Sequence, residues 1–252
     1  MGREGSANKG SGPSNPDICH EHFQVLAGTI HATISKFWWG HKQEERKIHW
    51  LSRLKLCQGK EDGGFGFRDM EAFNDALLAK QGWCLLKNSD SLPARLLKAR
   101  YFPTTSFLDA DLGSRLSYVW RRIWGVREVV TQGSRWLIGN GKDVNFWQDR
   151  WILRPVTFKL ITTKPPDTQL FHVSDLIDTN LGGWNDDLVK RSFLPCNVEA
   201  ILNIPLCLSW PADKLVWHYT TSGVFSVRSA YHLIMANKSS RIGCSRMDDN
   251  KF

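Results

Sequence analysis

The chain has 252 residues, 42% of them hydrophobic, with twelve tryptophans and a formal net charge of +8. That length and apolar content predict a packed core and exclude a wholly disordered chain. No apolar run is long enough to span a bilayer, and the N-terminal residues contain no apolar secretory segment. We therefore expect an intracellular protein, nuclear or cytoplasmic, that is not secreted and has no membrane partner.

The cysteines and histidines do not follow a metal-ligand pattern. Six cysteines are present, and the two closest, Cys196 and Cys207, are eleven residues apart. His20 and His22 carry suitable donors, but no second pair stands at ligand spacing. We expect reduced thiols, no metal site and no cofactor.

The start of the chain predicts a tail, a helix and a turn. Residues 1–16 are mostly Gly, Ser, Asn, Lys and Pro, a composition typical of disorder. From Ile18 apolar residues recur every three or four positions, which predicts an amphipathic helix that ends near Gly40. The glycine-rich run 63–67 suggests a phosphate loop but lacks the lysine spacing of one. A tight turn that directs its two phenylalanines toward a core is the favoured interpretation.

Three more helices are predicted in the next stretch. Ser91 is expected to be the N-cap of the second of them, since its hydroxyl can accept a backbone N–H group of the first turn. The expected helices run from Asp69 to Cys84, from Ser91 to Pro103 with Pro93 in the first turn, and from Ser117 to Val130.

Two β-hairpins are predicted in the second half. Asn140-Gly141 favours a two-residue type I′ turn, which needs positive φ at both central positions, and apolar residues alternate in 136–138 and 144–146. The second hairpin would pair 215–219 with 224–227 and turn the His218 side chain to solvent.

Shorter segments surround the second hairpin. A proline-containing linker is expected over 154–171, then a short element at 172–177 and helices near 185–193 and 197–202. A further helix is expected over 228–235, followed by loose polar residues.

These elements predict an α+β protein, with a helical N-terminal part followed by β-hairpins and short helices. Its expected regions are, in order, a disordered tail (1–16), a mainly helical, linker- or thumb-like region that ends in the first hairpin (17–153), a linker (154–171), a small α+β region (172–235) and a loose tail (236–252).

Four sequence blocks suggest an origin: Phe37 to Asp69, Ala72 to Pro103, Trp120 to Trp151, and Asp213 to Ile234. In this order they resemble the region downstream of the polymerase domain in plant LINE-type (non-LTR) retrotransposon reverse transcriptases, and the resemblance covers roughly residues 17–235. In that family a Cys/His-rich reverse-transcriptase zinc-binding domain follows this region. The resemblance implies a truncated fragment between the two domains, from a region that supports the handling of template nucleic acid.

The resemblance does not extend to the catalytic residues of the family. Its polymerase domain carries an aromatic-x-Asp-Asp box whose aspartates hold the catalytic metals, and no such box occurs in this chain. The close aspartate pairs, at 109/111, 186/187 and 248/249, are expected to be acids of solvated turns and helix starts. We expect no catalytic activity, because an independent enzyme would need a set of catalytic residues that the sequence does not display.

Positive charge gathers in the middle of the chain. From Ser91 to Lys159 there are twelve Lys and Arg against five Asp and Glu, whereas from Leu160 to Phe252 the counts are nine and nine. Basic residues with aromatic neighbours neutralise phosphates and stack on bases, although Lys and Arg also coat ordinary helices.

Two hypotheses about function therefore remain open. The chain is either a non-catalytic retrotransposon relic or an accessory module, reused by a host, that binds RNA or single-stranded DNA. The candidate binding residues are Arg121, Arg122, Arg127, Arg135, Lys142, Arg150, Trp136 and Trp147. The sequence leaves the oligomeric state open.

Overall fold

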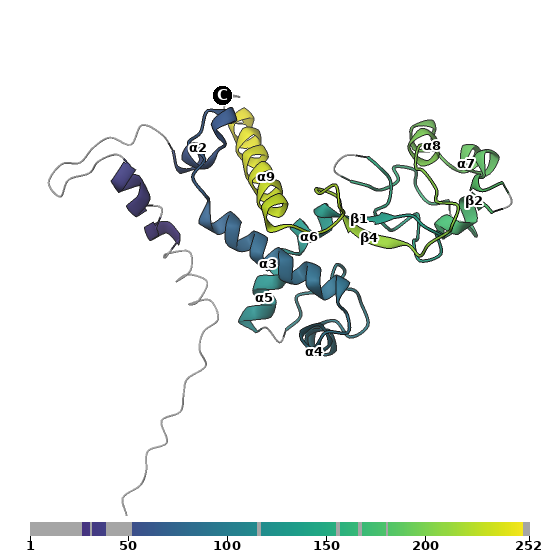
Figure 1. The fold of residues 1–252 in the computed structure, drawn as a ribbon, viewed down its shortest axis with the longest axis horizontal. Coiled ribbons are helices and arrows are strands. Elements are labelled where there is room, and N and C mark those ends of the chain that lie inside the picture. Colours follow the sequence, from purple (N-terminus) through teal and green to yellow (C-terminus); the bar gives the residue numbers. More distant parts are fainter. Residues whose placement is uncertain are drawn as a thin grey trace, which may run out of the picture.

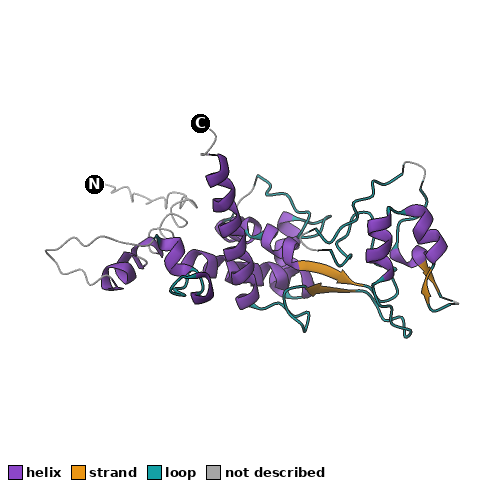
Figure 2. Cartoon of the chain, turned by 90° about the horizontal axis from the view of Figure 1, so that it is seen from above, coloured by secondary structure: helices purple, strands orange, loops and turns teal. Residues whose placement is uncertain are grey.

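The computed structural model describes residues 27–30, 32–38, 52–114, 117–154, 157–165, 168–179 and 181–248. Helices dominate these residues, with two short antiparallel sheets, so the α+β prediction is confirmed (Figure 2). The predicted tail at 1–16 and the start of the first predicted helix lie outside the described residues, whereas 27–30 and 32–38 are helical.

The elements follow one another in this order: α2 (Arg53–Cys57), η1 (Lys60–Asp62), α3 (Met70–Lys87), α4 (Leu92–Tyr101), α5 (Tyr118–Gly125), α6 (Arg127–Gly133), β1 (Ser134–Leu137), η2 (Val173–Leu176), β2 (Ile177–Asp178), β3 (Gly183–Trp184), α7 (Asp186–Ser192), α8 (Pro195–Leu202), β4 (Lys214–Trp217) and α9 (Val227–Asp248).

The predicted starts of the three helices are confirmed, but one of the three preceding residues does not cap its helix. The Asp69 carboxylate accepts the backbone N–H groups of Glu71 and Ala72, both at 3.0 Å, and so caps α3. Ser117 caps α5 in the same way through the Trp120 N–H at 3.2 Å. Ser91 precedes α4 as expected, but its hydroxyl donates to the Asn88 carbonyl instead of capping the helix.

The third predicted helix is broken. Its residues form α5 and α6, separated by Val126 at φ −98° and ψ 7°. Gly125 is a weak helix former, and the break leaves both Val126 and Val130 buried in the same core.

The predicted hairpin at Asn140-Gly141 is wrong. β1 pairs antiparallel with β4, about 80 residues away, in the register Ser134↔Trp217 to Leu137↔Lys214. Of the central dipeptide, Gly141 alone has positive φ, 69°, and residue 145 forms only an isolated bridge with His172.

Asp213 explains why the local hairpin does not form. Its carboxylate accepts the backbone N–H groups of Gly139 at 2.7 Å, Gly141 at 3.0 Å and Asp143 at 3.0 Å. These donors are satisfied by a buried carboxylate that precedes β4, so the loop folds around Asp213 instead of pairing with itself.

The second predicted hairpin forms only in part. β4 is a strand, but the segment after the turn is not, because the backbone returns through single bonds such as Trp217 N–H to the Gly223 carbonyl at 2.8 Å. Phe225 does pack on Trp217, with ring centroids 4.5 Å apart, as expected. α9 then begins at Val227 and continues to Asp248, so the expected end of this helix at Met235 is wrong.

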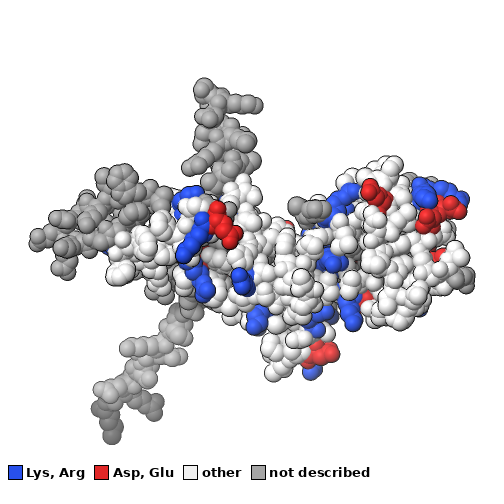
Figure 3. Space-filling model, turned by 45° about the horizontal axis from the view of Figure 1, so that its top comes forward, with Lys and Arg blue, Asp and Glu red and all other residues white. Residues whose placement is uncertain are grey.

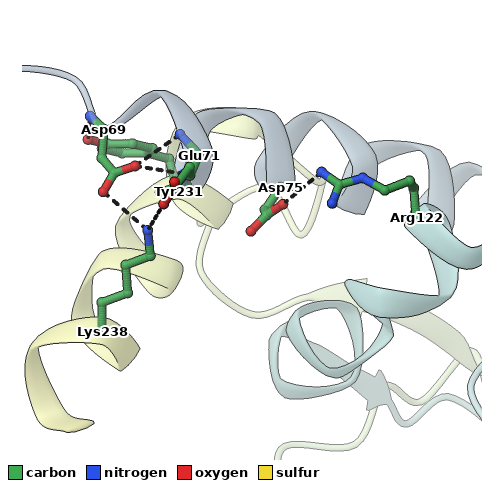
Figure 4. Close-up of polar contacts among 7 residues, drawn as sticks. Asp69, Glu71, Asp75, Arg122, Tyr231 and Lys238 are labelled. Carbon is green, nitrogen blue, oxygen red and sulfur yellow. Dashed lines mark hydrogen bonds and ion pairs between the residues drawn. The ribbon is translucent and has the colours of Figure 1, made fainter. Parts of the chain in front are cut away.

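Helix α9 is held against α3 by a polar network (Figure 4). The Asp69 backbone N–H donates to the Tyr231 hydroxyl at 2.9 Å. The Lys238 ammonium lies 3.1 Å from the Asp69 carboxylate and 3.6 Å from that of Glu71. Burial raises the pKa of Tyr231. The cap of α3 therefore also anchors a helix more than 150 positions away.

Two hydrophobic cores organise the described residues. The first core is formed by buried residues of the segment from α3 to α6, together with Trp217 and one face of α9. The second core is formed by buried residues from the segment Ile138 to Ile204. Figure 1 shows the β1–β4 ribbon between the two parts, with α7 and α8 on the far side of it from α3. The chain thus enters the second core after β1 and returns to the first through β4.

The glycine-rich run forms a turn, with Gly63 at φ 73° and Gly66 at φ 71°. Its two phenylalanines do not enter a main core. Phe65 is 39% exposed, and both Phe65 and Phe67 lie edge-on to Trp38 with ring centroids 5.3 Å apart.

Candidate nucleic-acid interface

The structure distributes the candidate basic residues over three places. Arg121, Arg122 and Arg127 lie on α5 and α6, whereas Arg135 on β1 and Arg150 flank the β1–β4 ribbon, and Lys142 is exposed in the loop around Asp213. On the face drawn in Figure 3, Lys and Arg side chains are spread over the molecule, and Asp and Glu lie beside them in several places.

The α5–α6 arginines are partly occupied by contacts within the fold. The Arg122 guanidinium lies 3.7 Å from the Asp75 carboxylate of α3 (Figure 4). Arg127 donates to the Ala110 carbonyl and lies 4.8 Å over the ring of Trp124. Burial raises the pKa of Asp75, although the charge of Arg122 opposes the shift.

The two candidate tryptophans belong to the second core. Trp136 and Trp147 are half-buried and pack against it, and the Trp147 indole donates to the Leu170 carbonyl at 2.9 Å. They are therefore braced within the fold and present only part of their surface to solvent.

The β1–β4 ribbon brings a different set of side chains together, which we call the ribbon cluster: Arg135, Arg150, Phe158, His218 and Tyr219. The Arg135 Nε donates to His218 Nδ1 at 3.3 Å. The His218 ring lies 4.6 Å from that of Phe158 and 5.2 Å from that of Tyr219, centroid to centroid. The Arg150 guanidinium lies 5.3 Å over the Phe158 ring.

Backbone bonds fix this cluster. The Trp136 N–H donates to the Arg150 carbonyl at 2.7 Å, and the His218 N–H donates to the Gly133 carbonyl at 2.8 Å. The first bond attaches Arg150 to strand β1, and the second continues the β1–β4 ladder by one residue beyond the ends of the two strands. The positions of both arginines and of His218 are therefore set by the sheet.

Partial burial destabilises the charged forms of the basic side chains in the ribbon cluster. Partial desolvation lowers the pKa of Arg135, and it lowers that of Arg150, with the Glu128 carboxylate opposing the shift. Burial and the charge of Arg135 lower the pKa of His218. Among the described residues no carboxylate forms an ion pair with Arg135. An anion placed beside this guanidinium would offset the desolvation.

Phe158 adopts a conformation that non-glycine residues rarely take. Its φ is 52°, and its carbonyl accepts the N–H groups of Trp151 at 2.8 Å and Ile152 at 3.0 Å. Residues held in such strained conformations cluster at ligand-binding sites. Here the strain places an almost fully buried ring beneath His218 and Arg150.

The sequence did not identify three members of the cluster. Phe158 and Tyr219 carry no motif, and His218 was expected to be a solvated histidine; it is exposed, but it also contacts Arg135 and Phe158. His218 is 83 positions from Arg135, so no local spacing reports their contact.

No group of three or more His, Cys, Asp or Glu side chains in the described part of the chain could hold a metal ion. None of the helices described is both long and apolar enough to cross a bilayer.

Comparison with known proteins places the chain among plant proteins. No family model and no solved structure matches it. It is 31% identical over 225 residues to a putative ribonuclease H protein of Arabidopsis thaliana, At1g65750, which covers 86% of this chain but 36% of that protein. The chain therefore spans only about a third of the length of this relative.

A second relative is covered almost completely. The chain is 41% identical over 136 residues to the uncharacterized mitochondrial protein AtMg00310 of Arabidopsis thaliana, across 54% of this chain and 88% of that protein. The two relatives together point to a plant transposon-related protein. With this identity and coverage, the chain belongs to the family of the uncharacterized mitochondrial protein AtMg00310.

Proposed function

We propose that the chain is a retrotransposon-derived segment that corresponds to the region between the polymerase and zinc-binding domains of a LINE-type reverse transcriptase. In this proposal it binds RNA or single-stranded DNA weakly and has no catalytic activity of its own. The order of the four sequence blocks and the plant relatives support this origin.

The convergence of Arg135, Arg150 and His218 on one ribbon carries the binding proposal. Arg135 and Arg150 come from segments on either side of the loop around Asp213, and His218 comes from the residue after β4. Two half-buried guanidinium groups and an imidazole in one place favour an anion, because charge-assisted hydrogen bonds to phosphate would offset their desolvation.

Fluorescence anisotropy of a labelled oligouridine tests this function directly. We expect micromolar binding at low salt, and an affinity that falls by about tenfold or more when salt rises from about 50 to about 200 mM. The reason is that Lys and Arg side chains of the protein displace counterions from the phosphates, and added salt opposes this release. A matched single-stranded DNA should behave similarly. A protein with native near-ultraviolet circular dichroism that shows no saturable binding would contradict the proposal.

The absence of catalysis is a separate part of the proposal. Two of the closely spaced aspartates have local roles: Asp109 accepts the Ser106 hydroxyl at 2.7 Å, and Asp186 lies in the first turn of α7, where it pairs with Lys190 at 3.2 Å. Acids at that end of a helix complement its dipole.

Two activity assays test this second part. We expect neither primer extension on an RNA template nor cleavage of an RNA–DNA hybrid, with Mg²⁺ or Mn²⁺, above a control without protein. Hybrid cleavage that copurifies with the chain and is lost in Asp186→Asn or Asp109→Asn would establish an enzyme instead.

A further inference from the structure

We propose that the ribbon cluster is a nucleotide subsite for single-stranded nucleic acid, in which Arg135, His218 and Arg150 hold one backbone phosphate and the Tyr219 ring stacks on the adjoining base. This inference rests on the proposed binding function and adds to it the place of contact and the reason for a preference for single strands.

The phosphate half is built on Arg135. Its Nε is used by His218, and its two terminal amino groups form no hydrogen bond to the residues that the structure describes. A guanidinium presents such a pair of donors in the geometry that a phosphate accepts. The adjacent imidazole supplies a further donor, and the Arg150 guanidinium, which lies over the Phe158 ring and donates to the Gln132 carbonyl at 3.4 Å, adds positive charge.

The stacking half is built on Tyr219. Tyr219 is 42% exposed as a residue, so it is accessible from solvent. Its ring is braced by the fully buried Trp217, with centroids 6.0 Å apart, and lies edge-to-face against His218 at 5.2 Å. A ring that is already fixed loses little freedom when a base stacks on it, and every base offers a π-face.

The shape of the cluster is set before any ligand binds. The strained Phe158 places its ring below His218 and Arg150, and the β1–β4 register places Arg135 beside the strand that leads into His218 and Tyr219. Strained backbone conformations cluster at ligand sites, so the conformation of Phe158 is consistent with a binding site here. This observation is independent of the charges.

A single strand is the occupant that both halves require. The phosphate contact alone would accept a duplex, a free nucleotide or inorganic phosphate. Stacking on Tyr219 needs a base that is not paired and stacked within a helix.

The test compares four variants by anisotropy with a fluorescein-labelled oligouridine. Tyr219→Ala should weaken binding about tenfold, and Tyr219→Phe, which restores the ring, should bind more tightly than Tyr219→Ala. Arg135→Gln should weaken binding and reduce the slope of log affinity against log salt by about one. Arg191→Gln is the control, because it removes the same charge from the exposed surface of α7.

Thermal unfolding and circular dichroism show whether each variant is folded. If Arg135→Gln does not fold, the comparison of Tyr219→Phe with Tyr219→Ala still tests the subsite. Competition identifies the occupant. An unlabelled single strand should displace the probe at concentrations at which a duplex of the same length, uridine monophosphate and inorganic phosphate do not. Equal competition by any of the three would overturn the subsite.

The possible failures are distinguishable. If the wild-type chain binds oligouridine and Arg135→Gln and Tyr219→Ala bind as tightly as Arg191→Gln, the subsite is wrong and the binding function stands. If the folded wild-type chain does not bind at all, both are wrong.

Discussion

Gly133 and Trp217 are in direct contact at the end of the β1–β4 ribbon: a Cβ on Gly133 would lie 2.0 Å from the Trp217 ring. Trp217 is fully buried in the first core, and its indole N–H donates to the Ser229 hydroxyl of α9 at 2.8 Å. The absence of a side chain at Gly133 is therefore what lets β4 return to α9 through this core.

Gly133→Ala should consequently destabilise the protein by about 1–3 kcal/mol, since an added methyl group must displace a ring that has no room to move. Urea unfolding followed by tryptophan fluorescence measures the change. Gly125→Ala is the matched control, because a Cβ there meets nothing within 4 Å and alanine favours helix. If the two variants have the same stability, the contact does not constrain the ribbon.

The loop around Asp213 depends on a single carboxylate. Asp213→Ala removes the acceptor of three backbone N–H groups, and we expect a loss of about 3 kcal/mol, because donors in a buried loop lose a charged partner. Hydrogen exchange should show faster exchange at Gly139, Gly141 and Asp143. Asp187→Ala, in the exposed first turn of α7, should cost less than about 1 kcal/mol. Unchanged exchange at the three amides would contradict this role.

The stability of the protein should depend on pH through Asp75. Burial raises the pKa of this carboxyl above 3.8, so the folded state holds the proton more tightly than the unfolded chain does. The resulting stabilisation is complete below 3.8 and is lost as pH rises through the higher pKa of the folded state. Between low and neutral pH, the free energy of unfolding of the wild type should therefore fall relative to that of Asp75→Asn, because asparagine does not ionise. A difference independent of pH would be inconsistent with a carboxyl whose pKa is raised by partial burial.

Nucleic-acid binding should also depend on pH, through His218. Burial and Arg135 hold the pKa of this imidazole below 6.5, and its Nδ1 accepts from Arg135 in the neutral form. Tyr219 and Phe158 are the other groups against the ring, and Arg150 adds positive charge nearby. A bound phosphate stabilises the protonated form, so binding takes up a proton and affinity should rise as pH falls below neutrality.

Anisotropy titrations of oligouridine across this pH range check the expectation, with His218→Gln as the comparison. The variant should bind with an affinity that changes less with pH than that of the wild type. If both respond equally, another group is responsible for the proton uptake.

The stretch around the Asn140-Gly141 dipeptide could not be predicted correctly from the local sequence. The dipeptide and the alternation around it favour a hairpin, and no nearby residue argues against one. The buried Asp213 carboxylate and the pairing of β1 with β4 satisfy the same backbone donors in a different way. Likewise, α9 continues past its predicted end, where the Lys238 ammonium reaches the Asp69 carboxylate on α3.

The sequence by itself determined the local structure: where helices begin at Asp69, Ser117 and Asn185, and that apolar periodicity produces helices and strands in an α+β fold. These features depend on neighbours within a few positions, where side-chain oxygens accept the first N–H groups of a helix. It also identified Arg135 and Arg150 as candidates for phosphate contact.

Only the tertiary structure decided which strands pair and which side chains meet Arg135. The ribbon joins segments some 80 positions apart, and the contacts of Arg135 with His218 and of Arg150 with Phe158 follow from that pairing and from one strained backbone conformation. Such contacts form because burial of Trp217 and satisfaction of buried N–H groups outweigh local turn preference, and these are energies of the whole fold that no local pattern encodes.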